Sequence, residues 1–120
     1  MAWTVLFHDE FEAEFDKLSL AVQRELLTQA ATLEDLGPQA SRPRVDTLSG
    51  SQFDKMKELR FSAAGGEWRV AFAFDSERQA ILLVVGDKTG SKEKRFYREL
   101  LAKADRRLKQ HEQQLNQTDN

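Results

Sequence analysis

The sequence contains no cysteine and only two histidines, and these shortages exclude several kinds of site. Without cysteine the chain can form neither a disulfide framework nor a cysteine–zinc centre. His8 and His111 are too few and too far apart in sequence to suggest a metal centre, and we expect both on the surface. The sequence therefore predicts no cofactor and no bound metal.

Long apolar stretches are also missing. The longest runs from Ala80 to Val85 and is far too short to span a membrane. The chain does not open with a basic region followed by an apolar stretch, so no secretory signal is visible. Its 120 residues, of which 40% are hydrophobic, suffice for one core. We expect a single domain over residues 1–120 of a soluble, cytoplasmic protein without membrane contacts.

The net charge of −2 conceals an uneven distribution along the chain. Residues 1–54 hold four Lys and Arg against ten Asp and Glu, whereas residues 55–109 hold fourteen against eight. Such asymmetry suggests a surface for a polyanion, built from the second half. Charges that simply cluster on solvated helix faces explain it equally well.

Hydrophobic spacing predicts a strand over residues 3–7 and then two helices. The first helix carries apolar side chains at four-residue spacing, and Asp9 is its expected N-cap. Ser19 is the expected cap of the second helix, which ends at Gly37-Pro38 because proline cannot continue a helix. These two helices should form a helical hairpin.

The second half alternates with period two. After a polar loop over residues 38–53, we expect strands at residues 55–61, 68–74 and 80–85, the last apolar on both faces and therefore central. A helix from about residue 91 follows, and residues 113–120 are expected to fray. The order β-α-α-β-β-β-α is an α+β fold: a small antiparallel-rich sheet with the helical hairpin on one face and a C-terminal helix.

The face of the sheet that carries Arg69 is expected to be hollow. Its neighbours on that face of the same strand, Ala71 and Ala73, are small, which predicts an open concavity around a basic residue. Alternatively, the final helix covers this face and Arg69 is a structural arginine.

Short motifs in this half resemble one known family. Met56-Lys57-Glu58-Leu59-Arg60 and Glu67-Trp68-Arg69-Val70 resemble the Lys-Glu-Leu-Arg and Arg-Val pattern of RelE/HigB toxins. Three further motifs follow in the order typical of the phage-derived, HigB-like branch, namely Gly86-Asp87-Lys88, Phe96-Tyr97 and Ala104-Asp105. The resemblance extends from the first strand to about residue 111.

The resemblance implies a RelE-like fold and the toxin of a type II toxin–antitoxin pair. Such toxins cleave mRNA in the ribosomal A site without a metal, by attack of a 2′-hydroxyl on the adjacent phosphate. The implied partners are the ribosome, mRNA and a cognate antitoxin, expected to be a helix-turn-helix protein. The reaction needs a group to take the 2′ proton, charge stabilisation at phosphorus, and help for the leaving 5′-oxygen.

Cations in the matched region are the candidate site residues. Arg69 is the first candidate for stabilising the transition state, because a guanidinium matches a pair of phosphate oxygens. Tyr97 aligns with the family's functional tyrosine and could stack on a base or pass a proton. The remaining predicted catalytic residues are Lys57, Arg60 and Lys88.

A second predicted set would bind substrate. Cations at a helix start oppose the helix dipole, so the basic start of the last helix favours a role in meeting phosphate. This set comprises Lys55, Lys92, Lys94 and Arg95. Each candidate also has an ordinary explanation as solvated surface charge, and the identity of the general base stays open.

Two other functions fit the same architecture. ParE toxins share it but poison DNA gyrase and cut no RNA, and an inactive toxin fold could serve as a binding module. The collected cations favour the nuclease. Acidic residues around the first helix suggest that the antitoxin docks there, unless they only keep the protein soluble: Asp9, Glu10, Glu12, Glu14 and Asp16.

Overall fold

Five strands form one sheet, in the order β1-β5-β4-β3-β2, in the computed structural model, which describes residues 2–118. They are β1 (Thr4–Phe7), β2 (Val45–Thr47), β3 (Lys57–Ala63), β4 (Gly66–Phe74) and β5 (Gln79–Asp87). β1 pairs with β5 in parallel, and the other neighbours are antiparallel. The antiparallel-rich α+β prediction is confirmed, and the apolar strand β5 is interior as expected.

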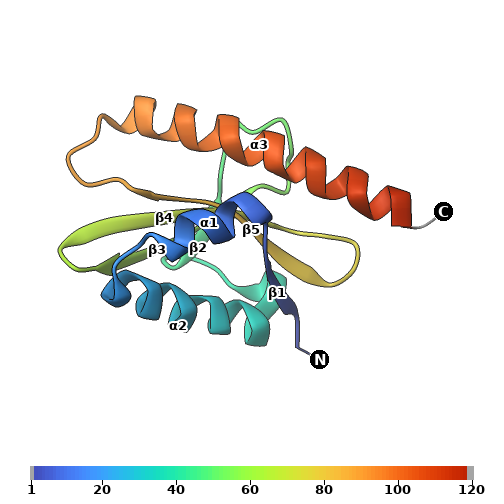
Figure 1. The fold of residues 1–120 in the computed structure, drawn as a ribbon, viewed down its shortest axis with the longest axis horizontal. Coiled ribbons are helices and arrows are strands. Elements are labelled where there is room, and N and C mark those ends of the chain that lie inside the picture. The colour runs from blue at the N-terminus through green and yellow to red at the C-terminus, as the bar shows by residue number, and fades with distance from the viewer. Residues whose placement is uncertain (1, 119–120) are drawn as a thin grey trace.

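Helices cover both faces of this sheet (Figure 1). They are α1 (Asp9–Asp16), α2 (Leu20–Leu36), the short 3₁₀ turn η1 (Gly37–Gln39) and α3 (Glu93–Thr118). On the α2 side, the apolar stripe of the helix packs on inward-facing strand residues such as Leu59 and Phe72. On the α3 side, Leu100, Ala104 and Leu108 pack on β4 and β5. The sheet therefore lies between two apolar layers, as a buried central strand requires.

Local signals explain where the first two helices begin and end. Ser19 caps α2 as predicted, with its hydroxyl accepting the Val22 N–H at 3.4 Å. Gly37 ends the helix at φ +55°, where a Cβ would lie 2.4 Å from the Trp3 ring, so only glycine fits. The cap predicted for α1 is wrong: His8, not Asp9, precedes it, and its Nδ1 accepts the Glu10 N–H at 3.1 Å.

Three further expectations are corrected. The polar loop contains an additional edge strand, β2, because Val45 is buried beside Leu59. Residues 113–118 continue α3 instead of fraying, while residues 119–120 lie outside the described chain. The predicted concavity is filled, since α3 lies over Ala71 and Ala73, which are fully buried.

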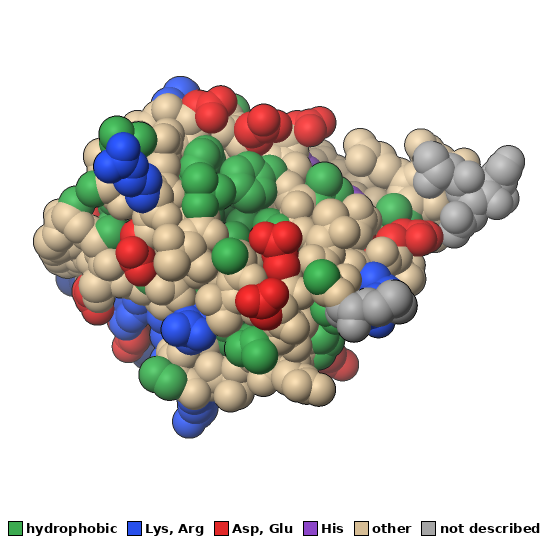
Figure 2. Space-filling model, turned by 90° about the horizontal axis from the view of Figure 1, so that it is seen from below, with side chains coloured by type: hydrophobic (Ala, Val, Ile, Leu, Met, Phe, Trp, Pro, Cys, Tyr) green, Lys and Arg blue, Asp and Glu red, His purple; other side chains and the backbone are tan. Residues whose placement is uncertain are grey.

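Part of the hydrophobic surface of α2 stays exposed. Leu20, Leu27 and Leu36 are between 43% and 58% accessible, although the opposite stripe of the helix is buried. Figure 2, which views the molecule from below Figure 1, shows hydrophobic side chains gathered on one face with acidic groups beside them. The solvent-facing side of α2 thus carries large hydrophobic side chains where a helix exposed to water usually carries polar ones.

Candidate active site

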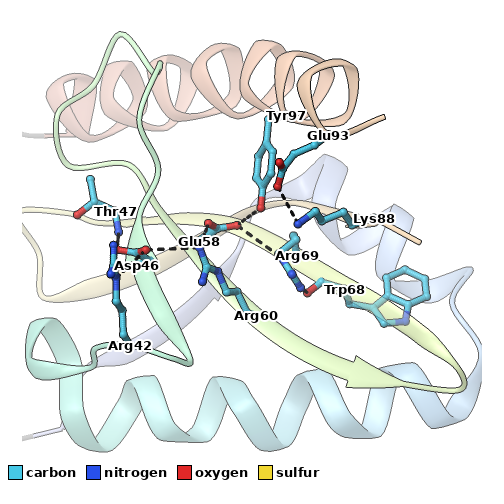
Figure 3. A network of polar contacts seen from close by, with 10 residues as sticks. All are labelled: Arg42, Asp46, Thr47, Glu58, Arg60, Trp68, Arg69, Lys88, Glu93 and Tyr97. Carbon is cyan, nitrogen blue, oxygen red and sulfur yellow. Dashed lines mark hydrogen bonds and ion pairs between the residues drawn. The ribbon is translucent and has the colours of Figure 1, made fainter. Parts of the chain in front are cut away.

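A buried carboxylate, Glu58 on β3, organises the polar cluster between the sheet and α3 (Figure 3). Its Oε1 accepts a hydrogen bond from the Tyr97 hydroxyl at 2.7 Å, and its Oε2 accepts one from Arg60 Nη2 at 2.9 Å. Arg69 Nε lies 3.7 Å from Oε1. A carboxylate that is only 3% exposed needs such partners, because an unpaired buried charge is strongly destabilising.

Strand pairing brings the two arginines together. Arg60 of β3 lies directly opposite Arg69 of β4 and therefore on the same face of the sheet, which is also the face of Glu58. The hydrogen bond to Glu58 raises the pKa of Arg60 and keeps its guanidinium charged. Within the described chain, the buried Nε atoms of both arginines have no hydrogen-bond partner. The cluster thus holds two guanidinium groups side by side, and each has one buried N–H that no hydrogen bond to residues 2–118 satisfies.

Tyr97 and Lys88 close the cluster from the α3 side. Burial and the hydrogen bond to Glu58 raise the pKa of the Tyr97 hydroxyl, so it remains a proton donor. Lys88, just beyond β5, places Nζ 5.7 Å from the centre of the Tyr97 ring and 3.0 Å from Glu93 Oε1. That contact with Lys88 lowers the pKa of Glu93. Four predicted catalytic residues, Arg60, Arg69, Lys88 and Tyr97, therefore meet at one place.

An open groove of about 420 Å³ continues from this cluster along the edge of β3. Arg60 and Arg69 line both the groove and the cluster, so the two are continuous. The other wall comes from α2, through Glu25 and Gln29, and from Arg44 in the loop before β2. An extended, negatively charged chain fits this combination of shape and charge.

The other predicted site residues lie elsewhere. Lys57 is on the opposite face of β3 from Glu58, because it pairs across the strands with Phe72 of the α2-side core. Lys55 forms an ion pair with Glu112 at 2.7 Å. Glu112 is fifteen residues beyond Tyr97, or about 22 Å along α3. The structure does not bring either lysine to the cluster.

The basic start of α3 belongs to its other flank. Arg95 pairs with Glu99 at 3.2 Å, and with Lys92 it lines a separate hollow beside Phe96. Lys94 is exposed. Since Tyr97 points towards β3 whereas Phe96 packs near Gly86 of β5, this basic surface flanks the cluster without entering it.

Polar anchors fix the remainder of α3, and they correct two expectations. His111 is buried, not on the surface, and its Nε2 lies 2.8 Å from Asp75 Oδ2 in the β4–β5 turn. Arg107 contacts Glu14 through two hydrogen bonds of 2.7 and 3.0 Å, and the exposed Arg106 contacts Glu10 similarly. The hydrogen bond from Arg106 lowers the pKa of Glu10. Glu10 and Glu14 of α1, which we expected to form part of the antitoxin-binding surface, are thus bound to arginines of α3.

Glu58 is the important residue that sequence reasoning missed as a site residue, although it lies within the quoted Lys-Glu-Leu-Arg motif. Alternation along β3 places it on the face shared with Arg60, and an acidic side chain between cations was a usable signal. Its partner Tyr97 is 39 residues away, so the contact itself could not be read locally.

Neither a metal-binding cluster nor a membrane-spanning helix is found among the described residues. Residues 2–118 contain no group of three or more His, Asp or Glu side chains arranged to hold a metal ion. In the same part of the chain, no helix has the length and apolarity needed to cross a membrane.

Comparison with solved structures identifies the fold. A mutant of the Escherichia coli toxin RelE in the free state superimposes with a TM-score of 0.62 at 17% identity, over 89% of this chain and 98% of that one. The RelE–RelB complex from Pyrococcus horikoshii OT3 matches with a TM-score of 0.54 at 20% identity, over 76% of this chain and 100% of that one. The protein therefore has the RelE-like fold.

Sequence comparison identifies the family. Residues 13–109 match the model of the phage-derived protein Gp49-like family. Two Mycobacterium tuberculosis proteins, named as proposed toxins HigB2 and HigB3, are 42% and 41% identical. The first match covers 72% of this chain but only 43% of HigB2, and the second covers 78% of this chain and 83% of HigB3. The chain belongs to the Gp49-like family and is a RelE/HigB-type toxin of a toxin–antitoxin system.

Proposed function

We propose that this toxin is a metal-independent endoribonuclease that cleaves mRNA on the ribosome by attack of a 2′-hydroxyl on the adjacent phosphate. The observation that supports it best is the Glu58 cluster, in which one carboxylate, two arginines and a tyrosine hydroxyl meet at the end of an open groove. This set supplies a proton acceptor, positive charge and a proton donor, which are the three needs of the reaction.

The groups divide these tasks by their chemistry. Arg69 and Arg60 would stabilise the negative charge that develops on the phosphate oxygens. Glu58 is the one carboxylate that contacts both arginines and Tyr97 in the described chain, so we assign it as the general base. Tyr97, whose raised pKa keeps it protonated, would donate to the phosphate or leaving oxygen, and Lys88 beside it would add positive charge.

The decisive experiment compares wild type with Arg69→Ala. Induction of the wild type should stop growth, and primer extension on cellular mRNA should reveal new 5′ ends within translated codons. Arg69→Ala should lose both effects while remaining folded, because removing a preorganised donor for developing charge costs about 10²–10³ in rate. A variant that stays toxic at normal expression would remove Arg69 from the mechanism.

The role of Glu58 needs its own variant. Glu58→Gln keeps the volume and the acceptor for Tyr97 but cannot take a proton, so cleavage should fall by about 10²–10⁴. The free energy of unfolding of Glu58→Gln, measured beside its cleavage rate, serves as the control for structural effects, because Tyr97 itself is assigned a part in the chemistry. If Glu58→Gln cleaves at the wild-type rate, another group is the base.

Two alternatives give different products. A ParE-like toxin would leave mRNA intact and trap DNA gyrase on cleaved DNA, whereas an inactive binding module would not arrest growth. The proposed partners are the ribosome, mRNA and a cognate helix-turn-helix antitoxin, and we propose the cytoplasm as the location. Docking of the antitoxin on Glu10 and Glu14 now has less support, since both carboxylates pair with α3.

A further inference from the structure

The backbone edge of β3 beyond its pairing with β2 has no part in the proposed chemistry. β2 pairs only with Lys57–Leu59, so residues 60–63 have no strand neighbour on this side within the described chain. The Arg60 N–H instead donates to the Arg44 carbonyl at 2.8 Å. That hydrogen bond fixes the backbone of the Arg44 loop at the mouth of the groove.

The charges along this edge leave one cation free. Of the two carboxylates in the groove wall, Glu67 accepts from the Ser62 hydroxyl and Glu25 accepts from Gln29 Nε2 at 2.9 Å. Arg60 and Arg69 contact Glu58. The exposed guanidinium of Arg44 has no ion pair with any residue between 2 and 118. It therefore stands at the rim of the groove with all its donors available.

We propose that this groove binds the RNA backbone next to the cleaved bond, and that Arg44 contacts a flanking phosphate. The proposal rests on the proposed ribonuclease function. A strand whose reacting phosphate lies at Arg60 and Arg69 must leave the cluster in some direction, and these two arginines also line the groove. Pro43 and Phe61 add apolar wall against which a ribose can pack. The ligand is thus a single-stranded phosphodiester, read by charge and not by base.

The test combines a protein variant with a change at one phosphate. Cleavage of an mRNA on programmed ribosomes is measured as kcat/KM, with single uncharged methylphosphonate linkages placed in turn on either side of the cleaved bond. Arg44→Ala is compared with wild type and with Arg24→Ala, which removes the same charge from an exposed position of α2 outside the groove. The two changes form a double-mutant cycle.

At one flanking position, the uncharged linkage should lower kcat/KM of the wild type about tenfold, the effect of losing one exposed hydrogen bond to a charged group. With normal RNA, the kcat/KM of Arg44→Ala should be lower than that of the wild type by about the same factor. The methylphosphonate at that position should then lower the kcat/KM of Arg44→Ala no further. Arg24→Ala should behave as wild type.

Two results would overturn the assignment of Arg44 while leaving the ribonuclease proposal intact. In the first, the substitution and the uncharged linkage lower kcat/KM independently, so that their factors multiply when they are combined. In the second, Arg44→Ala cleaves normal RNA with the kcat/KM of the wild type. Arg44→Ala that cleaves normally but fails to bind the antitoxin would show that the groove takes an acidic protein segment instead. A wild-type protein that cleaves no RNA would overturn both proposals.

Discussion

Replacing Arg107 by methionine tests how α3, and with it Tyr97, is held on the sheet. The pairing of β4 and β5 shifts register between Ala71 and Phe72, which makes Leu83 an extra residue in β5. The Leu83 carbonyl accepts from Arg107 Nη1 at 2.7 Å in a buried position. Arg107 is itself only 3% exposed and also binds Glu14. One guanidinium thus joins α3, β5 and α1.

The expected loss of stability comes from the two groups that would lose their donors in Arg107→Met, the Leu83 carbonyl and the Glu14 carboxylate. Methionine keeps an unbranched apolar stem, but the Leu83 carbonyl loses this donor and Glu14 loses two. Removing one partner of a buried ion pair costs about 3–5 kcal/mol. Because the Glu14 side chain is 32% exposed, water recovers part of this, and we expect the free energy of unfolding to fall by about 3 kcal/mol. The melting temperature should then fall by about 10 °C.

The assay is urea and thermal unfolding followed by circular dichroism, with Arg106→Met as the matched control. Arg106 is the adjacent residue and forms the same bidentate contact with a glutamate of α1, but its side chain is 50% exposed. Solvent screens such a pair, so the control should change stability little. Equal effects of the two substitutions, or a loss below about 1 kcal/mol in Arg107→Met, would show that the buried guanidinium of Arg107 does not hold α3 on the sheet.

Two further predictions concern pH and metal. Burial alone would raise the pKa of Asp75, but hydrogen bonds from His111, Gln79 and Glu77 outweigh it and lower the pKa below the ordinary 3.8. The ionised Asp75 carboxylate therefore stabilises the fold fully above its ordinary pKa of 3.8, and this stabilisation is lost as pH falls through the lower pKa of the folded state. Asp75→Asn should accordingly lower the free energy of unfolding at neutral pH. It should also make that free energy decline less steeply below about pH 4. A decline as steep as that of the wild type would contradict this. Cleavage should also survive EDTA when ribosome integrity is restored separately, whereas a strict need for added divalent ion at the cleavage step would count against the proposed chemistry.

Local patterns determined what the sequence could predict. The cap at Ser19, the end of α2 at Gly37 and the alternation in β4 depend on neighbouring residues and were predicted correctly. The three-residue strand β2 has too few positions for a pattern, so it was missed. Residues 113–118 looked too polar for order, yet glutamine favours helix and the anchors at His111 and Glu112 hold the preceding turn.

The site was predictable in its cations but not in its organisation. Arg60 and Arg69 were recognisable by motif, and their pairing follows once the register is known. Lys57 was grouped with them because it belongs to the same motif, although the alternation along the strand already places it on the face opposite to Arg60, where the structure has it. The contacts of Glu58 with Tyr97, of Arg107 with Leu83 and of His111 with Asp75 join residues at least 24 positions apart. Contacts at such separation depend on the tertiary fold and leave no periodic signal.

The shortness of β2 also bears on how the protein avoids aggregation. An exposed strand edge invites pairing with another chain, and this sheet has edge strands of only four and three residues. The uncovered stretch of β3, residues 60–63, is equally short. It lies beside Arg44, Arg60 and Arg69, whose like charges would face each other if two copies met edge to edge. Neutralising these arginines would therefore endanger solubility as well as activity, so natural variants that lose toxicity should more easily lose Glu58 or Tyr97 than this basic edge.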